Sequence, residues 1–173
     1  MQRILTMLFF VLVGVQSFSQ DKPVPDYLIK QDFPDSVKTI PIEKLDGTAE
    51  NFSDLLNSFK GRKVVIDIWA SWCRDCIVGL PKLEELKKKS SSDKVAYVFL
   101  SVDTDENRWR SAIQRFGIEG EHYRIKSGWK NPLSNYIVLD WVPRYITLNE
   151  EGRVIMPKAI LANDRLLEES VIK

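Results

Sequence analysis

One segment of the chain, residues 63–89, restricts the fold more than any other. After the basic Lys63, residues 64–69 are β-branched or aromatic and apolar apart from one acid, which is typical of a strand buried on both faces. Residues 74–89 place leucines at helical spacing with lysines between them, and Pro81 within this segment predicts a kink. A buried strand followed at once by an amphipathic helix indicates an α/β fold.

The apolar pattern continues this alternation along the chain. Residues 94–102 predict a second buried strand, and residues 118–130 are expected to be irregular. The proline-rich stretch 20–40 is also expected to be irregular, with a short strand at its end, near 38–42. Helices are expected over 51–59, 105–116, 131–136 and 163–172, and a strand hairpin over 144–149 and 153–156. This order predicts a central mixed β-sheet flanked by helices on both faces.

The N-terminus has the pattern of a cleavable secretory signal. Arg3 precedes an almost wholly apolar run over 8–15, and small residues follow, which places the cleavage near Ser19–Gln20. The apolar run is short for a bilayer span, although a retained membrane anchor is the alternative. We therefore expect a signal peptide over 1–19, a lead-in over 20–40 and one folded domain over 41–173, exported to the periplasm.

Charge argues against nucleic acid as a partner. The 173 residues carry 25 basic and 24 acidic side chains, for a formal net charge of +1. The sequence shows no basic stripe of the kind that tracks a phosphate backbone. No Gly-rich phosphate loop stands out either, so we expect no nucleic-acid ligand and no nucleotide cofactor.

The two cysteines, Cys73 and Cys76, are only three residues apart. Cysteines of exported proteins usually form structural disulfides, but a bridge this short closes almost no chain and restricts the unfolded state little. Such a pair is better suited to reversible chemistry than to stabilisation. A zinc site would need two further ligands, and His122 is the only histidine, so we expect no metal.

The position of the pair predicts different roles for the two sulfurs. Cys73 falls in the first turn of the expected helix, where unpaired N–H groups and the helix dipole favour an anion and should lower the pKa of its thiol. Arg74 adds a positive charge, which Asp75 opposes. Cys73 is thus the expected exposed nucleophile. Cys76, one turn later and more shielded, should resolve the mixed disulfide.

Asp67 is the single acid in the buried strand over 63–69. Burial should raise its pKa, so that it could accept the proton of Cys76 when that thiol attacks. The alternative is an acid at a strand end, paired with a lysine or with water.

These residues resemble those of the thioredoxin superfamily. The segment WASWCRDC is similar to the family's active-site sequence, Pro81 matches its helix proline, and Asp67 falls at its buried aspartate. Val142-Pro143 resembles the dipeptide that carries the family's cis-proline. The signal segment, the lead-in and the insert before Val142 resemble the exported TlpA/ResA-like branch.

The resemblance implies a thioredoxin fold and dithiol–disulfide exchange with other proteins. Pro143, with a cis bond before it, and Val142 would line the substrate groove beside the cysteines. Arg74 and Asp75 stand in place of the Gly-Pro of common thioredoxins, and this pair tunes redox potential in the family. Gly79 stands where many members of the branch carry a glutamate, which puts any role of that glutamate in doubt here.

The tryptophans and the histidine indicate a functional role less clearly than the cysteines do. Trp69 and Trp72 flank the site, with Trp72 expected over the cysteine pair and core packing as the alternative for both. Three further tryptophans are expected to pack in the core, and His122 to lie on the surface. The tryptophans are Trp109, Trp129 and Trp141.

The sequence thus predicts a protein disulfide oxidoreductase that acts on disulfide or dithiol clients and works as a reductase. A reductase in an oxidising compartment would need a membrane-embedded electron donor. The alternatives are net disulfide oxidation and a thioredoxin-fold binding module without turnover.

Overall fold

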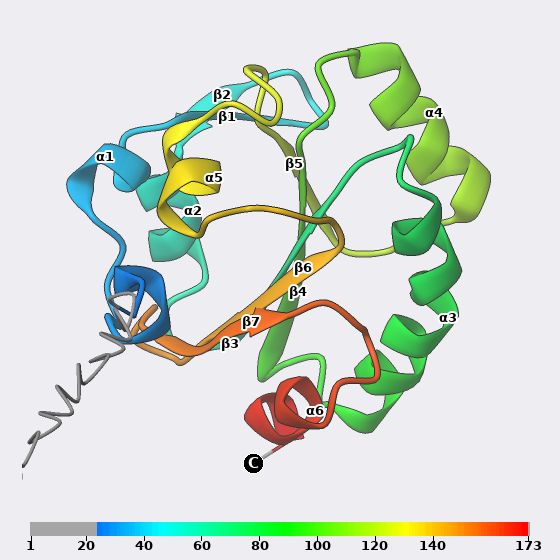
Figure 1. Ribbon diagram of the computed structural model, residues 1–173. Coiled ribbons are helices and arrows are strands. Elements are labelled where there is room, and N and C mark those ends of the chain that lie inside the picture. The colour runs from blue at the N-terminus through cyan, green and yellow to red at the C-terminus, as the bar shows by residue number, and fades with distance from the viewer. Residues whose placement is uncertain (1–23, 173) are drawn as a thin grey trace, which may run out of the picture.

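The central sheet of the molecule has seven strands in the order β2-β1-β5-β4-β3-β6-β7 (Figure 1). The computed structural model describes residues 24–172, so the expected signal segment and its cleavage near Ser19–Gln20 lie outside the described residues. The strands are β1 (Pro41–Lys44), β2 (Ala49–Asn51), β3 (Lys63–Trp69), β4 (Val95–Ser101), β5 (Glu121–Arg124), β6 (Arg144–Leu148) and β7 (Val154–Ala159). The helices are η1 (Asp26–Leu28), α1 (Asp35–Lys38), α2 (Phe52–Ser58), α3 (Arg74–Lys89), α4 (Glu106–Phe116), α5 (Pro132–Tyr136) and α6 (Arg165–Ile172).

Strand β3 is an interior strand of this sheet, between β4 and β6. It pairs in parallel with β4 and antiparallel with β6, and all of its residues from Val64 to Trp69 are buried. The predicted mixed sheet and doubly buried strand are therefore confirmed.

Helices cover both faces of the sheet, as predicted. The parallel order β3, β4, β5 requires right-handed crossovers, which place α3 and α4 together on one face. Figure 1 shows these two helices on one side of the sheet and α1, α2 and α5 on the other. Helix α6 lies near the C-terminal end of α3, where Lys89 and Glu168 form an ion pair of 2.6 Å.

The prediction of an irregular stretch over 118–130 was wrong, because β5 lies within it. Two of its polar residues, His122 and Arg124, are buried, and Arg124 pairs with Glu43 of β1. The expected surface position of His122 was also wrong. His122 is buried, with Nε2 2.8 Å from the carbonyl oxygen of Ile118 and its ring stacked on Phe99.

Gly120, just before β5, packs directly against β4. Its φ is +145°, and a Cβ atom there would lie 2.8 Å from both the Phe99 ring and the carbonyl oxygen of Tyr97. Only glycine fits this position without a shift of the neighbours.

The lead-in contributes side chains to the core. It contains η1 and α1, and the strand expected near 38–42 begins at Pro41. Tyr27 and Phe33 are buried, and the Phe33 ring meets that of Phe52 edge-on at 5.2 Å. The backbone N–H of Val154 donates to the carbonyl of Gln31 at 2.7 Å, which ties the lead-in to the edge of the sheet.

Among residues 24–172, no helix is both long and apolar enough to cross a bilayer.

Candidate active site

The cysteine pair lies where β3 ends and α3 begins. Cys73 is the N-cap of α3 and is joined to Cys76 by a disulfide, with their Cα atoms 5.3 Å apart. The backbone N–H of Cys76 points at the Cys73 sulfur over 3.0 Å. This donor would stabilise a Cys73 thiolate after reduction, as any anion at a helix N-terminus is stabilised.

Cys73 is less accessible than the sequence predicts, whereas Cys76 is shielded as expected. In the disulfide, Cys73 is 6% exposed and Cys76 is 2% exposed. Cys73 was expected to be exposed, but the surrounding side chains bury it and leave it open to one cavity. The order of accessibility agrees with the predicted roles of nucleophile and resolving cysteine.

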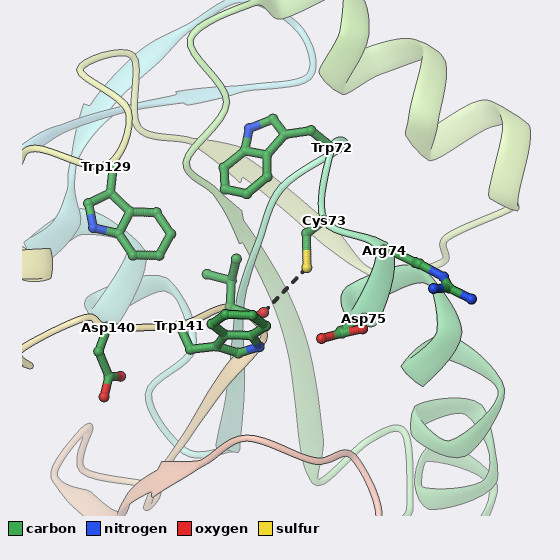
Figure 2. Close-up of a pocket in the computed structure, with 8 residues that line it drawn as sticks. Trp72, Cys73, Arg74, Asp75, Trp129, Asp140 and Trp141 are labelled. Atoms are coloured by element: carbon green, nitrogen blue, oxygen red, sulfur yellow. Dashed lines mark hydrogen bonds between the residues drawn. The ribbon is translucent and has the colours of Figure 1, made fainter.

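The Val142–Pro143 peptide bond is cis, as the resemblance implied. It brings the carbonyl oxygen of Val142 to 3.4 Å from the Cys73 sulfur (Figure 2). In the disulfide this sulfur carries no proton, so the contact is van der Waals. In the reduced protein a Cys73 thiol could donate to the oxygen, which opposes the effect of the Cys76 N–H.

A fully buried arginine anchors the loop that leads to Pro143. Arg144, the first residue of β6, donates to the carbonyl of Ile137 at 3.2 Å and pairs with Asp140 at 2.5 Å. This role could not be predicted from the sequence, because an arginine at the start of a strand is usually solvated.

Asp67 lies on the face of the sheet that α3 covers. It is opposite Tyr145 of β6, and a Cβ atom at Gly79 of α3 would lie 3.5 Å from the Tyr145 hydroxyl. Asp67 is 3% exposed, and the Oδ1 atom of its carboxyl has no hydrogen-bond partner in the described part of the chain. Burial raises the pKa of this carboxyl to about 8. Desolvation is the cause, since burial penalises the charged form.

A second buried carboxylate supports the loop before Cys73, and the sequence analysis missed it. Asp103 accepts from the backbone N–H of Ser71 at 2.8 Å, from the Ser71 hydroxyl at 2.7 Å and from the Ser101 hydroxyl at 2.7 Å. Asp103 follows β4, which is parallel to β3, so the carboxyl ends of both strands meet at the same edge. The position of an acid just after a buried strand parallel to β3 could have predicted that Asp103 lies near the cysteine loop.

Three tryptophans surround a cavity beside Cys73 (Figure 2). Of the tryptophans expected in the core, Trp109 is fully buried, whereas Trp129 and Trp141 line this cavity, and Trp141 is 56% exposed. Core packing was therefore wrong for Trp141. Trp69 is in the core, and Trp72 is 58% exposed with its ring 6.2 Å from that of Trp129. The cavity is lined by Trp72, Cys73, Arg74, Asp75, Trp129, Asp140, Trp141 and Val142, and its volume is about 470 Å³.

The profile of the thioredoxin-like family matches residues 61–154, which is more than half of the chain. The chain belongs to this family. It is 31% identical over 143 residues to the thioredoxin-like protein YneN of Bacillus subtilis, covering 81% of this chain and 69% of that protein.

Two further similarities agree with this assignment. The thiol-disulfide oxidoreductase ResA of Bacillus thuringiensis is 24% identical over 100 residues, which cover 58% of this chain and 56% of ResA. This match confirms the resemblance to the TlpA/ResA-like branch. The thioredoxin domain of a thiol-disulfide oxidoreductase from Bacteroides vulgatus superposes with a TM-score of 0.62 at 21% identity, over 81% of this chain and 96% of that domain.

Proposed function

We propose that this protein is a thiol–disulfide oxidoreductase that reduces disulfides in other extracytoplasmic proteins. The observation that carries the proposal is the Cys73–Cys76 disulfide at the start of α3, open to a cavity beside the cis Val142–Pro143 bond. Its relatives YneN and ResA are named as a thioredoxin-like protein and a thiol-disulfide oxidoreductase. Arg74 and Asp75 lie between the cysteines, are both exposed, and are proposed to tune the redox potential.

The reaction begins from the reduced dithiol. The Cys73 thiolate attacks one sulfur of the client disulfide, that S–S bond breaks, and one client thiolate leaves and takes up a proton. Asp67, in its ionised form, then accepts the proton of the Cys76 thiol, and the Cys76 sulfur attacks the Cys73 sulfur. The S–S bond between Cys73 and the client breaks, and the second client sulfur leaves as a thiolate that takes up the proton held by Asp67. The client thus gains two electrons, and the protein is left as the Cys73–Cys76 disulfide.

Asp67 suits the proton-transfer step because of its pKa. A carboxyl with a pKa of about 8 is close to an ordinary thiol, whose pKa is about 8.5, so the proton moves between them with little change in free energy. An Asp67→Asn variant should slow the resolving step and leave the first attack intact.

The test is reduction of insulin, with Cys73→Ser as the inactive control. Loss of turnover in Cys73→Ser supports the proposal, while an inactive unmutated protein would favour a binding module. A Cys76→Ala variant should hold clients as mixed disulfides that mass spectrometry identifies.

The direction of electron flow is tested by redox titration against glutathione. A potential near that of thioredoxin, about −270 mV, supports the reductase, which would draw electrons from a membrane-embedded donor. A potential near about −120 mV, that of a strong oxidant, would reverse the direction.

We also propose that the protein is periplasmic, with residues 1–19 removed near Ser19–Gln20, residues 20–40 as a lead-in and 41–173 as the thioredoxin-like domain. The support is the order of Arg3, an apolar run and small residues. Sequencing the mature N-terminus would test this, and an intact Met1 would favour a retained anchor.

A further inference from the structure

The cavity beside Cys73 has the walls of a side-chain binding site. The indoles of Trp72, Trp129 and Trp141 stand around one open space with the Cys73 sulfur at its side (Figure 2). Its volume of about 470 Å³ falls within the range of about 300–1,000 Å³ that is typical of ligand sites. A client cysteine that reacts with Cys73 must place its neighbouring residues next to this space.

The tryptophans leave a large apolar area uncovered. Trp72 and Trp141 are each more than half exposed, and the Trp72 and Trp129 rings lie 6.2 Å apart at a tilt of 36°. Soluble proteins seldom expose several large aromatic side chains around one hollow unless that surface binds something. Burial of an apolar guest between these rings would remove area from water on both partners.

The charges at the cavity do not favour an ionic guest. Asp140 is already paired with Arg144 at 2.5 Å and lies 3.6 Å from Lys158. Arg74 and Asp75 are exposed, and Figure 2 shows Arg74 pointing away from the indoles and the Asp75 carboxylate pointing toward Trp141. This carboxylate is one charge on a wall that is otherwise made mostly of indole rings. The indole faces, rather than a net charge, therefore decide what binds.

We propose that this cavity receives an aromatic or large aliphatic side chain adjacent to the client's cysteine, and so selects clients with such a neighbour. This inference rests on the proposed function, because it assigns the guest of the site at which Cys73 reacts. In this proposal the client backbone would lie along Val142–Pro143, and the tryptophan cavity would bind one of its side chains.

Trp129 is the cleaner probe of this site. Trp141 also borders a second hollow of about 410 Å³, which Pro143 and Leu161 line, so its loss would change two surfaces at once. Trp129 lines the first cavity and not the second.

The test uses the reduced protein and short peptides joined as disulfide dimers through a single cysteine. Phenylalanine, serine or lysine is placed directly before or after that cysteine, and each rate constant is divided by the rate of the same peptide with dithiothreitol. We expect the phenylalanine peptide to react about tenfold faster than the serine peptide, as partial burial of one aromatic side chain predicts. In Trp129→Ala this ratio should fall to about two, and any general loss of rate cancels in the ratio.

Leu166→Ala is the matched control, since Leu166 is an exposed apolar side chain on α6 and lines neither cavity. It should keep the full ratio. If Trp129→Ala fails to fold by circular dichroism, Trp141→Ala gives the same readout on a more exposed residue.

The outcomes separate the two proposals. Equal rates for the three peptides, with normal reduction of 2-hydroxyethyl disulfide, would refute the cavity's role and leave the oxidoreductase intact. A lysine peptide that reacts fastest would overturn the apolar guest. No reaction with any disulfide would refute the proposed function and this inference with it.

Discussion

Replacing Asp67 by asparagine should make the protein more stable near neutral pH. Burial raises the pKa of Asp67 from 3.8 to about 8, so the folded protein keeps a proton that the unfolded chain releases. The stabilisation from this group is complete below pH 3.8 and is lost as the pH rises through about 8. Asparagine has nearly the same shape and does not titrate, so it should remove this loss.

The magnitude follows from the size of the pKa shift. Between the two pKa values, folding binds one more proton than unfolding, and stability falls by about 1.4 kcal/mol per pH unit. From pH 3.8 to pH 7 this amounts to about 4 kcal/mol, a large part of the about 5–15 kcal/mol of a typical domain. The Asp67→Asn variant should therefore gain up to about 4 kcal/mol over the unmutated protein between about pH 4 and pH 7.

The assay is urea unfolding of both proteins in the disulfide form, at several pH values from about 4 to about 8. Asp93→Asn is the matched control, because Asp93 is exposed and its replacement should leave the pH profile unchanged. A difference between Asp67→Asn and the unmutated protein that does not vary with pH would refute the reasoning. It would mean that Asp67 is ionised and compensated in the folded state.

Three further predictions concern Asp103, Gly120 and His122. Asp103→Ala should lower the unfolding free energy in urea by about 3 kcal/mol, because the buried donors of Ser71 lose their charged acceptor, and an unchanged midpoint would contradict that role. Gly120→Ala should lower the unfolding free energy by at least about 2 kcal/mol, because the new Cβ would clash with β4. Gly152→Ala is the control, since a Cβ there meets no atom within 4 Å, and it should cost only about 1 kcal/mol. Equal losses in the two variants would refute the clash. Burial lowers the pKa of His122, so stability should be full above pH 6.5 and fall at more acidic pH, and His122→Gln should remove that fall in acid-unfolding curves.

The sequence predicted the parts of the fold that long apolar patterns encode. The doubly buried β3, the cysteine-bearing α3 and the hairpin of β6 and β7 are all present. Strand β5 was missed because His122 and Arg124 are polar, and their partners come from distant segments that local periodicity cannot show.

The sequence predicted only those site residues whose chemical role can be recognised from their immediate neighbours in the chain. The cysteine pair stands out because a disulfide between residues so close in sequence would stabilise the fold little. Asp67 stands out because it is an acid in an otherwise apolar strand. Asp103 and Trp141 are ordinary in sequence, and only the folded chain brings them to Cys73. No local pattern distinguishes a tryptophan that packs inside from one that borders a cavity.

The tie between the lead-in and β7 has a consequence for solubility. Strand β7 is the last strand of the sheet, and an unprotected edge can pair with the edge of another molecule. The bond from Val154 to Gln31, together with the buried rings of Tyr27 and Phe33, closes part of this edge. A shortened chain that begins at β1 would keep the cysteine pair but leave β7 open, and it should form soluble aggregates before it loses redox activity.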